Sequence, residues 1–137
     1  MNTSSSFYLF NLPEFKDERG QMCVAECEKN IPFVVKRIFY DFNNRVGDYP
    51  RGNHANRNSK FVFICLSGSC IINVNDGRDS KTFLLNSPSQ ALFVDKMVWK
   101  TMSEYSADSI LLIMSDCHYD SSEYIRNFEE FLEERKH

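Results

Sequence analysis

Short β-type segments, each closed by a turn signal, limit most strongly how this chain can fold. They recur at roughly 8–12-residue intervals and are rich in β-branched and aromatic residues or alternate apolar with polar positions. This spacing is typical of sandwiches and closed barrels of antiparallel strands. We predict strands at residues 7–12, 21–28, 34–41, 60–66, 69–75, 80–85, 90–94, 99–104 and 109–115.

The clearest turn signal is Asn-Asp-Gly-Arg at residues 75–78. An Asp-Gly pair suits the primed turns that join twisted antiparallel strands, because glycine readily adopts the positive φ that these turns need. The flanking segments, residues 69–75 and 80–85, are therefore predicted to form a hairpin. Residues 13–20 and 43–53 are polar and are expected to be loops.

The periodicity changes near the end of the chain. Asp120 and Glu123 have the spacing of a capping box, which predicts a helix that begins near residue 120 and covers about residues 120–135. Apolar residues then follow helical spacing, with glutamates mostly opposite. With 137 residues, the chain fits one domain, residues 1–137. The predicted fold is all-β: a closed β-sandwich or jelly-roll barrel of short antiparallel strands with one C-terminal α-helix.

Composition argues against several classes of protein. The net charge of −3 provides no general attraction to nucleic acid. No apolar run approaches the roughly 18 residues that a membrane helix requires. The first ten residues lack the basic start of a signal peptide, and the five cysteines are dispersed, which favours reduced thiols over disulfides. We therefore expect a cytoplasmic protein without nucleic-acid or membrane partners.

The residue types that carry chemistry concentrate between positions 49 and 56. Pro50 and Gly52 make a rigid turn that presents Arg51. His54 and Asn56 follow at a spacing of two, so that in a strand they point to the same face. This arrangement indicates a small polar site against a β wall.

Part of this region resembles the metal-binding cupins. Their pattern has two histidines two apart, then a glutamate, then a glycine near the end of the next strand. His54 and Gly68 match the first histidine and the glycine, whereas Asn56 and Lys60 replace the second histidine and the glutamate. The second cupin motif normally supplies another histidine, and Lys100 stands near that position. With three of four ligands replaced, we expect no metal.

A second resemblance extends over almost the whole chain and rests on the order and spacing of Asn30-Ile31-Pro32-Phe33, Lys36-Arg37, Phe39-Tyr40, Pro50-Arg51-Gly52, His54-Ala55, Leu66, Gly68-Ser69, Val98-Trp99, Tyr119-Asp120 and Glu123-Tyr124-Ile125-Arg126. In these stretches the chain resembles the cupin-type nucleotide-sugar 3,4-ketoisomerases, which convert dTDP-4-keto-6-deoxyglucose to its 3-keto isomer. The family usually has His-Ala-His and often a histidine after the tryptophan, where this chain has Asn56 and Lys100. The resemblance implies a homodimeric jelly roll without cofactor, acting before an aminotransferase and an acyltransferase. That pathway makes a 3-amino-3,6-dideoxy sugar for surface lipopolysaccharide.

Moving a ketone from C4 to C3 requires a base, an enediol and a returned proton, but no redox cofactor. His54 is the candidate base, because a histidine pKa lies near neutrality. Asn56 is a candidate for holding the enediol oxygen, and Lys100 for polarising the ketone or protonating the enediolate. Tyr40 is a candidate phenol donor. Each also has an ordinary explanation: a wall histidine, a strand-end amide, an exposed lysine and a core tyrosine.

A diphosphate would be bound by arginines, since the chain has no Walker loop. Arg51 is the first candidate because its turn is rigid, and Arg19 and Arg37 come next. Two other functions stay open at this point. One is a related cupin epimerase, which also uses a histidine base, and the other is a sugar-nucleotide-binding cupin without activity.

Overall fold

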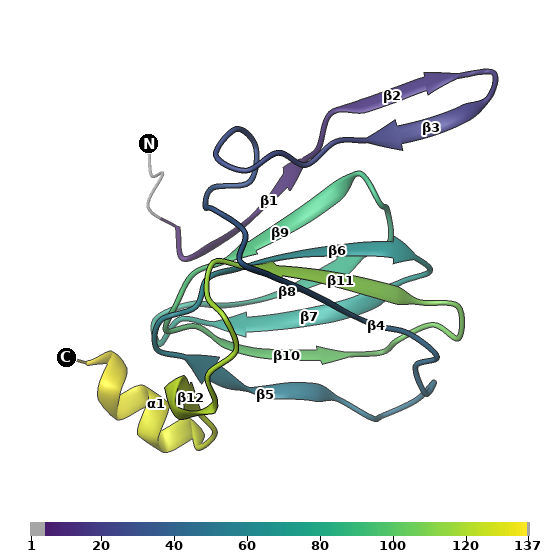
Figure 1. Ribbon diagram of the computed structural model, residues 1–137. Coiled ribbons are helices and arrows are strands. Elements are labelled where there is room, and N and C mark those ends of the chain that lie inside the picture. The colour runs from purple at the N-terminus through teal and green to yellow at the C-terminus, as the bar shows by residue number, and fades with distance from the viewer. Residues whose placement is uncertain (1–4, 137) are drawn as a thin grey trace.

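The computed structural model describes residues 5–136. Two five-stranded antiparallel sheets face each other, and a separate hairpin of β2 and β3 projects from the sandwich at the upper right of Figure 1. The strand order is β1-β9-β6-β11-β4 in the first sheet and β12-β5-β10-β7-β8 in the second. This confirms the predicted all-β jelly-roll class with one C-terminal helix. The strands are β1 (Phe7–Asn11), β2 (Glu14–Asp17), β3 (Gly20–Cys23), β4 (Arg37–Asp41), β5 (Arg51–Asn56), β6 (Phe61–Ser67), β7 (Cys70–Asn75), β8 (Ser80–Leu85), β9 (Gln90–Val94), β10 (Trp99–Ser103), β11 (Ile110–Ser115) and β12 (Tyr124–Ile125).

The first sheet is apolar on both faces, which explains the nearly continuous apolar sequence of β6. Phe61 and Phe63 point inward and join the main core between the sheets. Val62 and Ile64 point outward and join a second apolar cluster with Ile31 and its neighbours. Because alternate side chains of a strand face opposite ways, a strand buried on both sides needs apolar residues at every position.

Two segments expected as loops contain strands. β2 lies within residues 13–20, and all four of its residues are exposed. The sequence of β2 therefore shows no alternation of apolar and polar residues, because neither face of the strand packs against a core. β5 begins at Arg51, inside residues 43–53, and pairs with β10 through an irregular register. Two predicted strands are shorter than expected: the one at residues 21–28 ends at Cys23, and the one at residues 34–41 begins at Arg37. The other predicted strands occur at or near their expected positions, and residues 75–78 do connect β7 to β8.

The C-terminal helix α1 spans Phe128–Arg135 and starts about eight residues later than the sequence suggested. Asn127 is its N-cap, and the Asn127 side chain accepts a hydrogen bond from Glu130 N. Asp120 caps a short 3₁₀ helix, η1 (Ser121–Glu123), by accepting from Ser122 N. The chain then runs through β12 beside β5. Within residues 5–136, no helix is long and apolar enough to cross a membrane.

Candidate active site

An irregularity in β5 turns His54 toward the interior of the sandwich. Lys100 lies opposite His54, and Thr101 lies opposite Gly52, so Asn53 is an extra residue in the pairing. Gly52 and Asn53 both have positive φ, and a Cβ on Gly52 would lie 2.9 Å from the backbone oxygen of Lys100. Only glycine fits this approach. Bulges of this kind commonly redirect a side chain near an active site.

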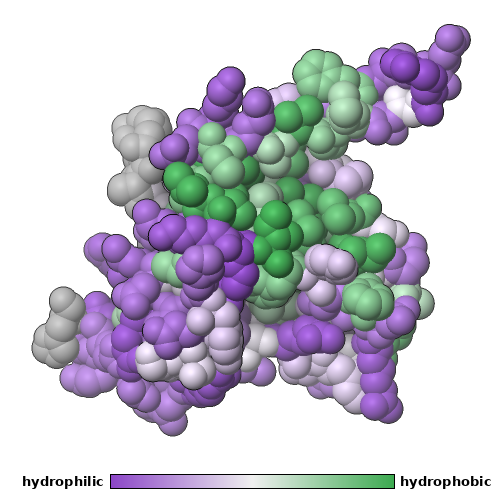
Figure 2. Space-filling model, viewed as in Figure 1, coloured by the Kyte–Doolittle hydropathy of each residue, from purple (hydrophilic) through white to green (hydrophobic). Residues whose placement is uncertain are grey.

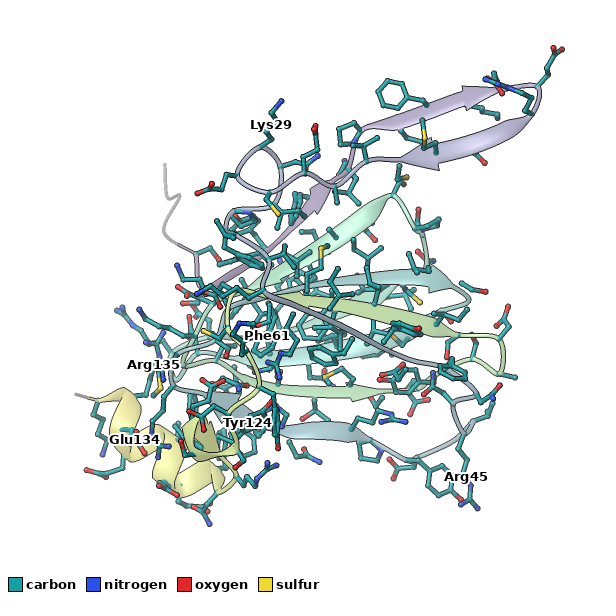
Figure 3. All side chains as sticks on the ribbon, viewed as in Figure 1. Lys29, Arg45, Phe61, Tyr124, Glu134 and Arg135 are labelled. Carbon is teal, nitrogen blue, oxygen red and sulfur yellow. The ribbon has the colours of Figure 1, made fainter. Side chains whose placement is uncertain are left out.

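His54 and Lys100 line one small cavity of about 60 Å³ between the sheets. Phe61 lines it from the first sheet and Tyr124 from β12; both side chains are labelled in Figure 3. The remaining lining is apolar: Phe39, Phe63, Met102 and Ile113. This volume accommodates about two water molecules. The cavity is therefore the inner end of a site, and most of a nucleotide sugar would extend outside it.

Lys100 is buried, with 2% of its surface exposed. Its Nζ donates a hydrogen bond of 2.8 Å to Asn56 Oδ1 and lies 4.6 Å from the centre of the Phe61 ring. Burial lowers the pKa of Lys100 to about 7, and the negative charge of Glu123 opposes that shift. Lys100 can thus change its protonation state near neutral pH, as a catalytic acid or base must.

His54 is neutral at the same pH. Burial, and next the positive charge of Lys100, lower the pKa of His54 to about 4. The centre of its ring lies 4.7 Å from that of Tyr124, and its Nδ1 is buried without a hydrogen-bond partner. An uncharged imidazole beside a cationic amine can accept a proton while the amine donates one.

Asn56 and Glu123 continue the hydrogen bonding from Lys100 away from the cavity. Asn56 is fully buried, and its Nδ2 donates a hydrogen bond of 2.9 Å to Glu123 Oε2. Glu123 also accepts hydrogen bonds from the backbone of Asn58 and from Ser59. These bonds lower the pKa of the Glu123 carboxyl, although its burial opposes them. Glu123 is therefore a buried carboxylate within two hydrogen bonds of Lys100.

The structure brings three of the four candidate catalytic residues together. His54, Asn56 and Lys100 share the inner surface of the second sheet. Tyr40 lies on β4 with its side chain 59% exposed, and its ring contacts Phe42 rather than the cavity. Its neighbour Phe39 lines the cavity instead. Tyr40 and Phe39 face opposite ways because they alternate along the strand.

The three candidate arginines occupy different places. Arg37 is nearest to the cavity, because its guanidinium lies 4.9 Å from the centre of the Phe39 ring. Its Nε and Nη2 are buried and have no hydrogen-bond partner. Arg51 is the first residue of β5, and its Nε lies 3.8 Å from Asp41 Oδ2. Arg19 lies in the projecting hairpin, 88% exposed and paired with Asp17 (Figure 1).

Glu123 and Tyr124 were not among the site residues predicted from the sequence. Both come from residues expected to be helical, and β12 places them beside β5. The sequence did contain one signal: Glu123-Tyr124-Ile125-Arg126 was among the stretches shared with the ketoisomerases. Within residues 5–136, no three His, Cys, Asp or Glu side chains are grouped as a metal site would require.

Comparisons with known proteins agree in one family. A family model described as "FdtA: WxcM-like, C-terminal" matches residues 5–136. TDP-4-oxo-6-deoxy-alpha-D-glucose-3,4-oxoisomerase from Aneurinibacillus thermoaerophilus is 36% identical over 123 residues, which are 90% of this chain and 88% of that protein.

Two crystal structures of 3,4-ketoisomerases have the same fold. One, from Helicobacter canadensis, is 37% identical with a TM-score of 0.91, over 96% of this chain and 98% of that one. The other is a histidine-to-asparagine mutant of QdtA from Thermoanaerobacterium thermosaccharolyticum, in complex with TDP-4-keto-6-deoxyglucose. It is 30% identical with a TM-score of 0.91, over 96% and 94% of the two chains. The chain therefore belongs to the FdtA-like family of sugar-nucleotide 3,4-ketoisomerases.

Proposed function

We propose that this chain converts dTDP-4-keto-6-deoxyglucose to a dTDP-3-keto-6-deoxyhexose through an enediol. One observation carries the proposal: a neutral histidine and a buried lysine face each other across paired strands and line one cavity. These are the two proton-transfer groups that the isomerisation needs. The relative solved with the same 4-keto sugar supports the choice of substrate.

In this mechanism His54 removes the proton on C3, and the electron pair forms a double bond between C3 and C4. Lys100 donates to the oxygen on C4, which completes the enediol. The hydroxyl on C3 then loses its proton, its oxygen becomes the new ketone, and C4 receives a proton. The sum is an isomerisation that consumes no electrons. The largely apolar wall around the two groups strengthens both interactions by excluding water.

The test is incubation with the 4-keto sugar in deuterium oxide, followed by NMR. A ketoisomerase yields a 3-keto product with solvent deuterium at C4. An epimerase would return an inverted 4-keto sugar, and a binding protein without activity would leave the substrate unchanged. Either of these two outcomes would refute the proposal.

The diphosphate is assigned to the arginines, with Arg37 and Arg51 as its donors within the chain. The unpaired nitrogens of Arg37 are suited to a bidentate contact with phosphate. Arg51 is held only loosely by Asp41. Arg19 projects on the hairpin, so it meets the nucleotide only if the hairpin of one protomer reaches the site of another (Figure 1).

Replacing Arg51 with alanine is expected to weaken TDP binding by about 10- to 100-fold, because a hydrogen bond to a charged group contributes about 1.5–3 kcal/mol. The rate of the bound substrate should change much less. Calorimetric titration with TDP measures the affinity. Arg78→Ala, in the exposed turn between β7 and β8, is the matched control and should bind normally. Equal affinities for both variants would remove Arg51 from the phosphate site.

Chelators are expected to leave the activity unchanged. A transition-metal ion needs several N, O or S ligands, and His54 is accompanied by an amide and an ammonium group that repels cations. The experiment measures turnover before and after dialysis against a chelator and determines the metal content by mass spectrometry. One zinc, iron or manganese per chain, with activity lost on its removal, would overturn the metal-independent mechanism.

A homodimer is the assembly that the surface favours. β1 is an edge strand of the first sheet, so its outer backbone groups are available for pairing with another chain. Apolar side chains also gather across the upper middle of Figure 2, where Figure 1 draws β1 and β4. The exposed apolar residues of these strands include Tyr8, Ile38 and Tyr40. A patch of this kind on a soluble protein commonly marks an interface.

Light scattering at micromolar concentration is expected to give the mass of two chains. Ile38→Asp should shift the mass to one chain, because it places a charge in the proposed interface. Leu84→Asp is the matched control: Leu84 is 54% exposed but lies on β8 in the other sheet, so this variant should stay dimeric. A monomeric wild type would contradict the proposed assembly.

We place the reaction in the cytoplasm, in the synthesis of a 3-amino-3,6-dideoxy sugar for surface polysaccharide. All five cysteines are free thiols, which suits a reducing compartment. The proposed product carries a ketone at C3, which is the group that a transaminase converts to an amine.

A further inference from the structure

Glu123 is a buried carboxylate that the proton transfers described above do not use. It is 4% exposed and lies at the end of η1, outside the cavity. Its Oε1 accepts from Asn58 N at 2.8 Å and from Ser59 N at 3.0 Å. Its Oε2 accepts from Asn56 Nδ2 and from the Ser59 hydroxyl. A buried carboxylate is costly unless it is fully hydrogen-bonded, and here both oxygens are satisfied.

The contacts of Glu123 fix the direction in which the Asn56 amide points. A carboxylate only accepts hydrogen bonds and an ammonium group only donates them. The amide between them can satisfy both neighbours in one orientation, with Nδ2 toward Glu123 and Oδ1 toward Lys100. In the flipped orientation, oxygen would face oxygen and N–H would face N–H. Glu123 therefore determines which atom of Asn56 Lys100 meets.

We propose that Glu123 is a positioning residue, which acts through Asn56 to hold the Lys100 ammonium group at the wall of the cavity. The inference rests on the proposed function, because the hydrogen bonds from Glu123 through Asn56 are taken to position Lys100, the group that donates a proton to the substrate. It also gives Asn56 a definite task. Both polar ends of its amide are occupied, so Asn56 serves the reaction through Lys100 and need not bind the enediol oxygen itself.

The titratable groups that influence Lys100 or its neighbour His54 come from three segments: η1, β5 and the residue after β12. Burial lowers the pKa of Lys100, and the negative charge of Glu123 in η1 raises it. His54 of β5 lies opposite Lys100 and stays neutral down to about pH 4. Arg126, just after β12, acts on His54. Removing the negative charge of Glu123 should therefore lower the pKa of Lys100.

The first test is Glu123→Gln. This side chain has the same size, but its amide group would face the amide group of Asn56. We expect kcat for the 4-keto sugar to fall at least about tenfold, because a small displacement of a catalytic group is costly. We also expect the alkaline limb of the rate profile to move to lower pH. Glu134→Gln is the matched control: Glu134, labelled on α1 in Figure 3, is a carboxylate that pairs with Arg57 and does not line the cavity, so its loss should shift nothing.

The second test exchanges the two groups in the double variant Glu123→Gln with Asn56→Asp. The new aspartate can accept from Lys100 and from the glutamine, while the glutamine oxygen takes the backbone donors of residues 58 and 59. The chain of hydrogen bonds is thereby restored with the charge moved one residue closer to Lys100. We expect kcat to recover at least severalfold over Glu123→Gln, and the alkaline limb to lie at higher pH than in the wild type. A merely structural carboxylate predicts no such opposite shifts.

A direct titration separates this inference from the proposed function. Protein labelled with ¹³C at lysine Cε reports the ionisation of Lys100 by NMR without substrate, and Lys100→Met assigns the signal. The midpoint should move down in Glu123→Gln and up in the double variant. If it does so in a protein that does not isomerise the sugar, the positioning survives and the proposed function fails. Identical midpoints in the variants and the wild type would overturn the positioning, and if Glu123→Gln does not fold, the double variant alone decides.

Discussion

His54→Asn is expected to isomerise dTDP-4-keto-6-deoxyglucose at least about 10²-fold more slowly than the wild type, while TDP binding changes little. Asparagine keeps much of the shape and polarity of histidine but has no basic nitrogen, and loss of a general base typically costs 10²–10⁴-fold. The neutral state of His54 makes this loss decisive, because its pKa of about 4 leaves the imidazole free to accept a proton at pH 7. Single-turnover NMR in deuterium oxide measures the rate.

The same experiment follows the C3 hydrogen of the substrate separately from product formation. Removal of the base should stop exchange of this hydrogen with solvent as well as the isomerisation. Should His54→Asn still exchange the C3 hydrogen at the wild-type rate, the base is another residue. Lys100 would then be the next candidate, since it lies opposite His54 in the same cavity.

The fold was predictable wherever burial gave the strands a pattern. β8 and β9 have the predicted bounds, and β6 and β7 are each within a residue or two of them, because their alternating or continuous apolar residues reflect real contacts with the core. β2 has no such pattern, since all four of its residues are exposed. A strand stabilised only by pairing with its hairpin partner leaves no apolar periodicity in the sequence.

The helix start was misplaced for a different reason. Asp120 and Glu123 have capping-box spacing, but the Glu123 carboxylate bonds to Asn56 and Ser59, which are more than 60 residues away along the chain. Long-range hydrogen bonds of this kind override local propensity and cannot be recognised from spacing. The same contacts create the part of the site that the sequence did not reveal.

The part of the site on β5 was easier to predict from the sequence. The alternation of His54 and Asn56 correctly placed both side chains on one face of a strand, and the family pattern drew attention to Lys100. Pairing of β5 with β10 was not predictable, because residues 43–53 were expected to be a loop and no strand was predicted between residues 41 and 60. For Tyr40 and Arg37, which face of β4 points inward depends on the packing of the two sheets.

Replacing Lys100 with methionine is expected to lower kcat about 10²-fold without unfolding the protein. Methionine has a similar volume and suits a cavity lined by Phe61, Phe63 and Met102. The variant therefore removes the ammonium group while retaining the packing. It also relieves the protein of a buried charge, although Asn56 Oδ1 loses its donor. A general acid typically contributes 10²–10⁴-fold, so a loss at the lower end of this range is the minimum expected.

The pH profile identifies the group that was lost. If His54 must be neutral and Lys100 protonated, kcat/KM in the wild type should fall below about pH 4 and above about pH 7. Lys100→Met should lose the alkaline limb. Its acid limb should move to higher pH, because the positive charge that helps to lower the pKa of His54 is gone. An alkaline limb that persists unchanged near pH 7 in this variant would show that Lys100 is not the acid, whatever the size of the loss in kcat.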